Sequence, residues 1–441
     1  MKKGIRLTAC FMILGLLLTL AGCGGGGSGG GGTATEDNRP ARDKVYDIIE
    51  AYPIAFSGIP PKELADRTDV AKGLPVEKKT SVRVAMSSGT MGSPFFTTMQ
   101  QGVASLAAEY GYDFDLQISD FNTEVGLQQL DAFITQGVDI ILANVDVQAA
   151  APTFKRAADA GIPVIATSNQ PVTSDTNVIT CILSGSYKSG WYVGEYTARK
   201  LYEPGMVFNV GFVLIQLGSG DTESRSNGFI SGFLYAAREI DGKPYPSKWE
   251  AMFDGYDVWR RFADSGKLSE PDLGLELMGY GQTPNANPDA PGGQAAAEDL
   301  IVAHGQTMDI LFVECDPMWP GVEVVLRQNS IVPGQDVYVT CAADGTREGM
   351  EAILEGKLMA IGNNSSSMNA IGMMTIVRNL FADGLDMNNI VPNTYTPTIA
   401  ITMENIGDFY DPNEPLAGGL QYALQTVDDY NASISPTSDP F

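Results

Sequence analysis

The sequence predicts an α/β protein made of two successive doubly wound units, each a parallel sheet covered by helices on both faces. Three observations carry this prediction. Short apolar runs alternate with segments whose apolar residues recur at helical spacing. Several runs are apolar throughout, which is typical of parallel strands buried on both faces. The same alternation begins a second time at Phe208.

The first unit begins after Ser81. Residues 82–86 alternate as a short strand, and the apolar residues of 99–110 then recur at intervals of four, three and four, on one face of a helix. The near-continuous apolar run 139–143 predicts a buried strand. In chain order, the expected elements are strand 82–86, helix 99–110, strand 114–118, helix 127–134, strand 139–143, helix 151–160 and strand 163–166.

The second unit repeats this pattern. Between its first helix and the rest we expect irregular structure over 241–293, because this stretch is rich in aromatic residues, prolines and glycines. The stretch could extend a cleft for a larger glycan or cover one lobe. The expected elements are strand 208–214, helix 224–240, helix 294–303, strand 309–313, helix 321–328, strand 336–341, helix 347–354, strand 357–361 and helix 369–381.

Composition narrows the class of function. The 441 residues suffice for about three domains, or for two larger lobes with extensions, and 44% are hydrophobic. There are 28 basic and 53 acidic residues, a net charge of −25. This charge repels phosphate backbones, so we expect no nucleic-acid partner. A single histidine, His304, argues against His-based metal sites or catalysis, and we expect neither a metal nor a cofactor.

The N-terminal residues predict an export signal with a lipid anchor. Basic residues precede an apolar stretch, 7–20, that is short for a membrane span. It ends in Leu20-Ala21-Gly22-Cys23, which resembles the bacterial lipobox, a signal cut before a cysteine that becomes lipidated. An ordinary signal peptide with a chance cysteine is the alternative. We expect a signal peptide at 1–22, then lipidated Cys23, a glycine-rich tether and an extension up to 79, which places the protein outside the cytoplasm on the cell membrane.

Removal of that signal would leave 25 basic and 53 acidic residues, a net charge of −28. It would also leave three cysteines besides Cys23, and an odd number means that at least one is free. Cys181 and Cys341 lie in strand-like runs, so we expect buried small hydrophobic residues and no disulfide framework. The third is Cys315.

Polar and aromatic residues follow the ends of the expected strands, where open parallel sheets bind ligands. After the first strand, a polar loop leads to Phe95 and Phe96, which suit stacking on a flat apolar face. Later strand ends supply amides, carboxylates and one arginine. Together these groups suit a neutral polyol, which needs apolar contact on its faces and hydrogen bonds at its rim. The residues that follow these later strand ends are Asn144, Asp146, Ser168, Asn169, Asp221, Arg225, Glu314, Cys315, Asp316 and Asp344.

A family resemblance rests on several stretches taken together. They are 93–96, 137–144, 160–165, 225–229 and 343–346. By their order, spacing and strand-end placement, the chain from about Val82 to Thr402 resembles the type I periplasmic binding proteins, in the ribose-like sugar-binding branch of bacterial ABC importers. The resemblance implies two doubly wound parallel-sheet lobes joined by a three-crossing hinge, which closes around a ligand for recognition by an ABC permease.

The resemblance also implies where the lobes divide. We expect crossings near Ser184, Ser365 and Pro397. The implied N-terminal lobe is 80–184 plus 366–397, the C-terminal lobe is 185–365 plus 398–425 with 241–293 as an insertion, and 426–441 is a tail. No Lys or Arg follows Arg378, so we expect a solvated acidic surface there.

Individual roles are implied residue by residue. Phe95 and Phe96 match the stacking aromatics of the family, and Asn144 matches a polar contact. Arg225 matches the arginine that donates to sugar hydroxyls, and Asp344 matches a hydroxyl-accepting carboxylate near the hinge. A hinge amide falls on Asn363 or Asn364.

Three positions depart from the family pattern. Ser93 replaces a frequent asparagine, Ser168-Asn169 replaces an Asp-Arg pair, and Cys315 replaces an asparagine before Asp316. Trp319 could add a stacking wall. Because strong donors are lost, a simple pentose or hexose is not implied. The candidate ligand-binding residues are Ser93, Phe95, Phe96, Asn144, Asp146, Asn169, Arg225, Cys315, Asp316, Trp319, Asp344 and Asn364.

Several candidates also have a purely structural interpretation. The two phenylalanines and Trp319 could be core residues, and Arg225 could pair with Asp221 or Glu223 on the surface. Asp344 could be a turn residue and Asn144 a helix cap.

Three classes of function remain in view. The leading hypothesis is a lipid-anchored solute-binding protein that delivers a sugar or related polyol to an ABC importer. The alternative is a surface sensor that presents its ligand to a membrane histidine kinase. An enzyme is disfavoured, because no dinucleotide-binding glycine motif, P-loop or nucleophile elbow is present.

Overall fold

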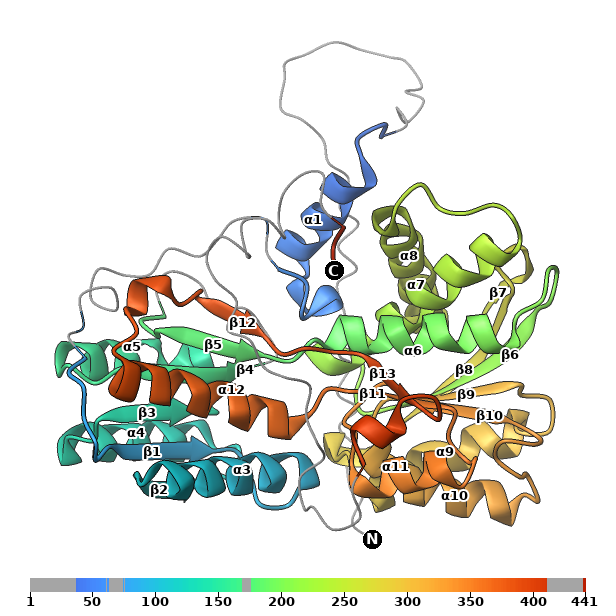
Figure 1. Ribbon diagram of the computed structural model, residues 1–441. Helices are drawn as coiled ribbons and strands as arrows, with labels where there is room; N and C mark the ends of the chain where they lie inside the picture. Colours follow the sequence, from blue (N-terminus) through green and yellow to red (C-terminus); the bar gives the residue numbers. More distant parts are fainter. Residues whose placement is uncertain (1–36, 61, 63–73, 75, 169–175, 411–438) are drawn as a thin grey trace, which may run out of the picture. The chain divides into compact units, whose positions relative to one another are not determined.

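Strands and helices alternate along the chain in the computed structural model (Figure 1). The structure describes residues 37–60, 62, 74, 76–168, 176–410 and 439–441. Pro40–Phe441 form one compact unit. The predicted signal, Cys23 and the tether lie outside the described residues. Within those ranges, no helix has the length and apolar character needed to cross a membrane.

The first sheet, with its helices, forms the N-terminal lobe. It has six strands, all parallel, in the order β12-β5-β4-β3-β1-β2. Its strands are β1 (Arg83–Ser88), β2 (Asp113–Ile118), β3 (Ile140–Ala143), β4 (Val164–Ser168), β5 (Thr180–Leu183) and β12 (Asn393–Tyr395). Its helices are α3 (Pro94–Tyr110), α4 (Thr123–Gln136), α5 (Val147–Asp159) and α12 (Ser366–Arg378).

Both faces of this sheet are buried, as its apolar strands predicted. Successive strand residues point to opposite faces. Along β3, Ile140 and Leu142 pack with α3 and α12, whereas Ile141 and Ala143 pack with α4 and α5. The alternation places one helix pair on each side and leaves the strand ends free to form loops.

The second sheet, with its helices, forms the C-terminal lobe. Its order is β13-β11-β10-β9-β6-β8-β7, parallel except for the two edge strands. Its strands are β6 (Phe208–Leu214), β7 (Leu268–Glu270), β8 (Leu275–Gln282), β9 (Ile310–Val313), β10 (Tyr338–Cys341), β11 (Ala360–Gly362) and β13 (Ala400–Thr402). Its helices are α6 (Ser186–Leu201), α7 (Gly220–Ile240), α8 (Lys248–Ser265), α9 (Ala290–His304), α10 (Trp319–Gln328) and α11 (Arg347–Leu354).

The chain crosses between the two sheets three times. The crossings connect β5 to α6, β11 to α12, and β12 to β13. Ser184, Ser365 and Pro397 lie in these connections, where the crossings were expected. Two parallel-sheet lobes joined by a three-crossing hinge are therefore confirmed.

The expectation of irregular structure and an insertion over 241–293 is wrong. This stretch contains α8 and both β7 and β8. Strand β8 pairs in parallel with β6 from Phe208 to Leu214, so the stretch completes the sheet. The aromatic residues Trp259 and Phe262 lie in the core between α8 and the sheet. The helical spacing of these aromatic residues in the sequence indicates helix α8.

Part of the N-terminal extension is folded onto the C-terminal lobe. Helix α1 (Ala41–Ala51) and the short turn after it bury Tyr46 and Phe56. These rings share a hydrophobic cluster with Trp191 of α6 and Trp249 of α8. The extension therefore contributes to the core, beyond what its polar composition suggested.

The described end of the predicted tail also packs on this lobe. The Phe441 ring meets Trp191 edge to face with centroids 5.1 Å apart. Its backbone oxygen accepts a hydrogen bond from Lys248 Nζ at 2.9 Å. The expectation of a solvated surface after Arg378 is thus wrong: Phe441 is half-buried, and Leu380, Phe381 and Ile390 are buried. Residues 411–438 lie outside the described residues.

Cys181, Cys315 and Cys341 are free and buried. The expectation for Cys181 and Cys341, small buried hydrophobic residues without a disulfide, is confirmed. Burial raises the pKa of all three thiols, which keeps them protonated and unreactive.

Candidate functional site

In the N-terminal lobe, the loop after β1 places two aromatic rings at the start of α3. Ser93 is the N-cap residue, with extended backbone, and Pro94 occupies the first helical turn. The rings of Phe95 and Phe96 meet edge to face with centroids 5.3 Å apart. Both are half-buried, and Phe96 packs against the lobe core. Phe95 is therefore the better placed of the two to offer a face to a ligand.

A third ring, Phe121, was missed from the sequence. It follows β2, is 65% exposed, and its centroid lies 5.3 Å from that of Phe96. Gly89 makes room for it, because a Cβ at that position would collide with the Phe121 ring. The rule that identified the other strand ends would have found Phe121 if applied to the second strand.

The side chains of Asn144 and Asp146 form hydrogen bonds that hold the loops at the strand ends. The Asn144 side chain accepts a hydrogen bond from Gly89 N–H at 3.2 Å and donates one to Thr167 Oγ1 at 3.0 Å. It thereby ties together the ends of three adjacent strands. Asp146 caps α5 by accepting from two backbone N–H groups. Asn169 lies outside the described residues.

In the C-terminal lobe, Arg225 lies on α7 and is only 4% exposed. Its guanidinium nitrogens lie 3.4 Å from Asp221 Oδ1, 3.7 Å from Asp344 Oδ1 and 3.9 Å from Glu314 Oε1. Burial lowers the pKa of Arg225, but the three carboxylates outweigh burial and raise it, so the arginine stays charged. Arg225 therefore pairs with Asp221, as the structural interpretation expected, but the pair lies in a buried cluster and not on the surface.

Glu314, at the end of β9, is a functional candidate that is not among the ligand-binding residues expected from the sequence. It is fully buried, and its Oε2 accepts from Ile215 N–H and Thr222 Oγ1, both at 2.6 Å. Burial raises the pKa of Glu314 to about 7, although Arg225 acts in the opposite direction.

Asp316, two residues after Glu314, has a structural role. Its carboxylate accepts from the backbone N–H groups of Asp344, Gly345 and Thr346 and from the Thr346 hydroxyl. It is fully buried, and burial raises its pKa. Its role is to hold the loop that carries Asp344, so the structure does not support direct contact with a ligand.

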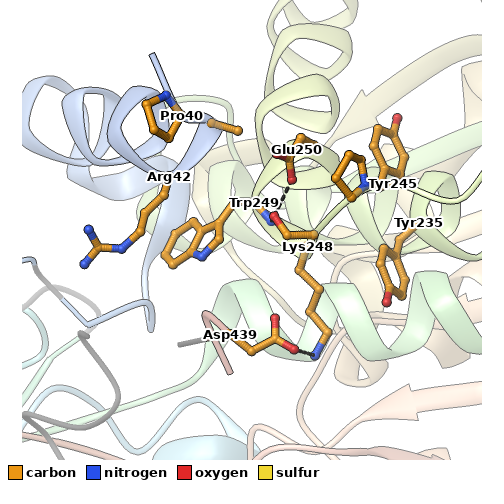
Figure 2. Close-up of a pocket in the computed structure, with 11 residues that line it drawn as sticks. Pro40, Arg42, Tyr235, Tyr245, Lys248, Trp249, Glu250 and Asp439 are labelled. Carbon is orange, nitrogen blue, oxygen red and sulfur yellow. Dashed lines mark hydrogen bonds and ion pairs between the residues drawn. The ribbon is translucent and has the colours of Figure 1, made fainter. Parts of the chain in front are cut away.

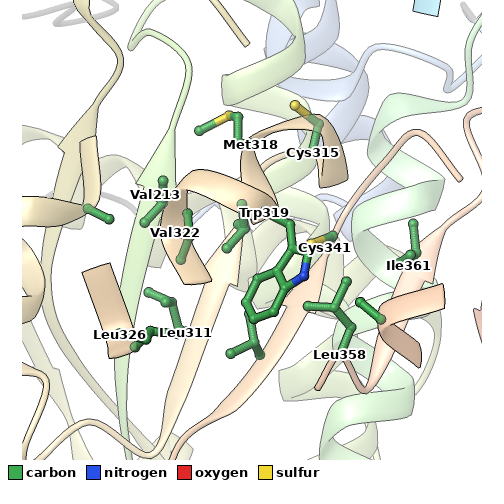
Figure 3. Packing of buried hydrophobic residues seen from close by; sticks show 14 of the residues in the cluster. Val213, Leu311, Cys315, Met318, Trp319, Val322, Leu326, Cys341, Leu358 and Ile361 are labelled. Carbon is green, nitrogen blue, oxygen red and sulfur yellow. The ribbon is translucent and has the colours of Figure 1, made fainter. Parts of the chain in front are cut away.

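Cys315 and Trp319 belong to the core of the same lobe. The Trp319 ring packs among Leu311, Val322 and Leu358, as Figure 3 shows. Trp319 is 2% exposed and Cys315 is 1% exposed. The core interpretation of Trp319 therefore replaces the expected stacking wall.

Asp344 and Asn364 complete the polar set. Asp344 points one carboxylate oxygen at Arg225, and burial raises its pKa to about 7, with Arg225 acting in the opposite direction. Asn364 follows β11 at the second crossing and is 2% exposed. Its Oδ1 has no hydrogen-bond partner among the described residues.

The structure thus gathers two kinds of groups, each at the carboxyl ends of strands in one sheet. Three aromatic rings lie on the N-terminal lobe, and one guanidinium with three carboxylates lies on the C-terminal lobe. Rings can cover the C–H face of a ligand, while the charged groups exchange hydrogen bonds with hydroxyls. In the part of the chain that the structure describes, no group of three His, Cys, Asp or Glu residues could hold a metal ion.

A pocket of about 470 Å³ lies elsewhere, beside α1 and α8 (Figure 2). Arg42, Tyr235, Tyr245, Lys248 and Asp439 are among its lining residues, and Lys248 pairs with Asp439 across 3.4 Å. None of the predicted site residues lines it.

Comparison with known proteins identifies relatives of the whole two-lobe region. The model of the periplasmic binding protein domain family matches residues 84–384. The chain is 26% identical over 278 residues to the ribose import binding protein of Salmonella typhimurium, covering 63% of this chain and 77% of the relative. Over 279 residues it is 27% identical to the ribose import binding protein of Escherichia coli, with the same coverage.

Solved structures share the fold. A solute-binding protein of an ABC transporter from Bacillus halodurans, with bound myo-inositol, has a TM-score of 0.53 at 22% identity over 76% of this chain and 98% of that chain. One from Actinobacillus succinogenes, with bound D-allose, has a TM-score of 0.55 at 17% identity over 74% of this chain and 100% of that chain. The resemblance to the type I, ribose-like branch is thereby confirmed, and the named relatives are binding proteins.

Proposed function

Because this chain belongs to the periplasmic binding protein domain family, we propose that it captures a sugar or related polyol and delivers it to an ABC importer. The observation that carries the proposal is the pairing of Arg225 with Asp344 at the strand ends of one lobe, combined with three exposed or half-buried rings at those of the other. Relatives named for ribose import, and structures with bound myo-inositol or D-allose, support this ligand class.

In this proposal, the rings of Phe95 and Phe121 cover an apolar face of the ligand, with Phe96 behind them. Arg225 donates to a hydroxyl oxygen, and Asp344 accepts from a hydroxyl. Ser93, Asn169 and Asn364 complete the proposed contacts, which meet when the hinge closes.

Ligand titration tests the proposal. A thermal-shift screen of the protein starting at Thr33 should give hits among mono- and oligosaccharides and polyols, because a ligand at a hundredfold excess over its Kd stabilises by about 2.7 kcal/mol. Phe95→Ala and Asp344→Asn should remove the shift. Asp299→Asn, an exposed position on α9, should keep it. Hits confined to amino acids or nucleosides would contradict the ligand class.

We propose further that Cys23 carries a lipid that holds the protein on the outer side of the cell membrane. The lipobox-like Leu20-Ala21-Gly22-Cys23 supports this. Cys23→Ser should abolish incorporation of a labelled fatty acid and release the protein from the membrane fraction. Retention of the label in the variant would contradict the proposal.

A further inference from the structure

The charges around Arg225 do not balance. One guanidinium faces the carboxylates of Asp221, Glu314 and Asp344, each within 3.9 Å of it. Even with Arg225 fully charged, the ionised cluster carries two more negative charges than positive. Asp316 lies directly behind Asp344 and adds no positive charge.

One buried acceptor and one buried donor in this cluster also lack hydrogen-bond partners. Glu314 is fully buried, yet its Oε1 has no hydrogen-bond partner among the described residues and only faces Arg225 Nη1 at 3.9 Å. Arg225 Nε is likewise buried without a partner. Buried polar groups are normally satisfied, and each one left unpaired costs about 1–3 kcal/mol. The cluster is therefore incomplete: Glu314 Oε1 lacks a donor and Arg225 Nε–H lacks an acceptor. Because carboxylates outnumber the guanidinium, a positively charged donor fits the cluster best.

Part of the cluster can be reached from solvent. The side chains of Asp221 and Asp344 are 32% and 11% exposed, whereas Glu314 is at the back. Ser186 Oγ donates to Asp221 Oδ1 at 2.9 Å, which holds that carboxylate in place. An incoming group would meet the two aspartates first, with the buried glutamate adding to their negative field.

Resting on the proposed function, we propose that the ligand is an aminated sugar or amino-polyol, whose protonated amine binds between Asp221 and Asp344 in the field of Glu314. A neutral polyol would supply donors but leave the charge surplus. An acidic or phosphorylated sugar would add to that surplus. A metal ion does not fit, because the described carboxylates form no metal-binding group and Arg225 lies among them.

The protonation behaviour of the cluster supports this. Burial raises the pKa of Glu314 and of Asp344 to about 7, so a proton is the occupant that an ammonium group would displace. At pH 6.5, where the sugar amine is already protonated in solution, binding of the amine should therefore release protons, and the neutral parent should release fewer. The charged and titratable groups that face the cluster are Asp221, Arg225, Glu314, Cys315, Asp316, Cys341 and Asp344.

Paired ligands test the inference by isothermal titration calorimetry at pH 6.5: D-glucosamine against D-glucose, D-galactosamine against D-galactose, and an amino-inositol against myo-inositol. At least one amine should bind tenfold or more tightly than its neutral parent. Glu314→Gln and Asp221→Asn should each bring that ratio close to one by weakening the amine, while Asp299→Asn leaves it unchanged. Asp221 is partly exposed, so its variant tests the idea even if Glu314→Gln folds poorly.

The outcomes separate the two proposals. The amine inference is overturned if neutral sugars bind as tightly as their amines. It is also overturned if the two variants leave the affinity ratio of amine to neutral parent unchanged. In both cases the proposal of sugar binding still holds. Absence of binding by every amine and every neutral parent overturns both. Titration in two buffers of different ionisation enthalpy gives the proton count, and equal proton release by amine and parent would also overturn the inference.

Discussion

The carboxylate of Asp316 accepts a hydrogen bond from the backbone N–H of Thr346 at 2.7 Å and another from its hydroxyl. It also accepts from the N–H groups of Asp344 and Gly345. A side chain at the end of β9 thus fixes the loop after β10, which carries Asp344. The position of the Asp344 carboxylate beside Arg225 depends on a residue that has no free acceptor to offer a ligand.

Asp316→Ala should therefore destabilise the protein and weaken ligand binding indirectly. Removing the acceptor leaves several buried N–H groups unpaired, and we expect a loss of about 2–4 kcal/mol in the free energy of unfolding. Urea unfolding measures it. Asp299→Asn, exposed on α9, should change the free energy of unfolding by less than about 0.5 kcal/mol. Unchanged stability with lost ligand binding would instead make Asp316 a direct contact.

Glycine allows the close approach of α6 and α7 that supports Arg225. A Cβ at Gly190 would collide with the backbone oxygen of Arg225, and one at Gly228 with that of Tyr187. Gly190→Ala should thus lower the free energy of unfolding by about 2 kcal/mol or more, since overpacking forces backbone shifts. Gly407→Ala is the matched control, because a Cβ there meets nothing within 4 Å. Equal melting temperatures for the two variants would contradict the close-packing argument.

The free energy of unfolding of the ligand-free protein should fall as the pH rises from about 5 to 8. The pKa values of Glu314 and Asp344 are raised by burial to about 7 in the folded state, above their ordinary values. The folded protein then holds protons that the unfolded chain has lost, so this stabilisation is complete below about pH 4 and is lost through pH 7. We expect a decrease of about 1–3 kcal/mol across this range.

Urea unfolding at several pH values measures the dependence. Glu314→Gln should reduce the dependence to the part contributed by Asp344, because glutamine does not titrate, whereas Asp299→Asn should leave it intact. Carboxylates with lowered pKa, such as Glu404 at about 2, lose their contribution at more acidic pH and do not mask the effect. An identical slope in Glu314→Gln and the unaltered protein would refute the assignment.

Local spacing sufficed for most of the fold. Strand 208–214 and helix 347–354 were predicted with their observed bounds, because apolar period and flanking polar residues define them locally. Helix α8 was missed although Trp249, Phe253, Tyr256 and Trp259 recur at intervals of four, three and three. Their aromatic character suggested a ligand surface and obscured the helical spacing, and nearby prolines and glycines suggested loops.

The site was harder to predict because long-range contacts decide which side chains remain available. Asp316 and Trp319 follow a strand end, as a ligand contact should, yet one is occupied by a loop about thirty residues later and the other enters the core. No local pattern contains that information. Arg225 and Asp344 were predicted as contacts, but their direct pairing and the buried Glu314 between α7 and β9 emerge only from the packing.

The folded extension gives a last prediction. Tyr46 and Phe56 share a cluster with Trp191 and Trp249, and Asn227 Nδ2 donates to Ala55 O at 2.9 Å. Helix α1 and the turn after it therefore pack on residues that lie within the family match. A protein starting at Lys62 should melt at least roughly 5 °C below one starting at Asp37, because it exposes these rings to water. The protein starting at Lys62 should also bind more of a hydrophobic dye than the one starting at Asp37.

The two truncations differ only in this segment, so the shorter chain also tests whether the extension is needed for ligand binding. The family match begins at residue 84, and the strand-end residues all lie beyond it. We therefore expect the same Kd per folded molecule in both, measured by calorimetry below the lower melting temperature. Equal melting temperatures would show that the cluster does not depend on α1. A weaker Kd in the shorter chain would mean that packing on α6 and α7 reaches the Arg225 cluster.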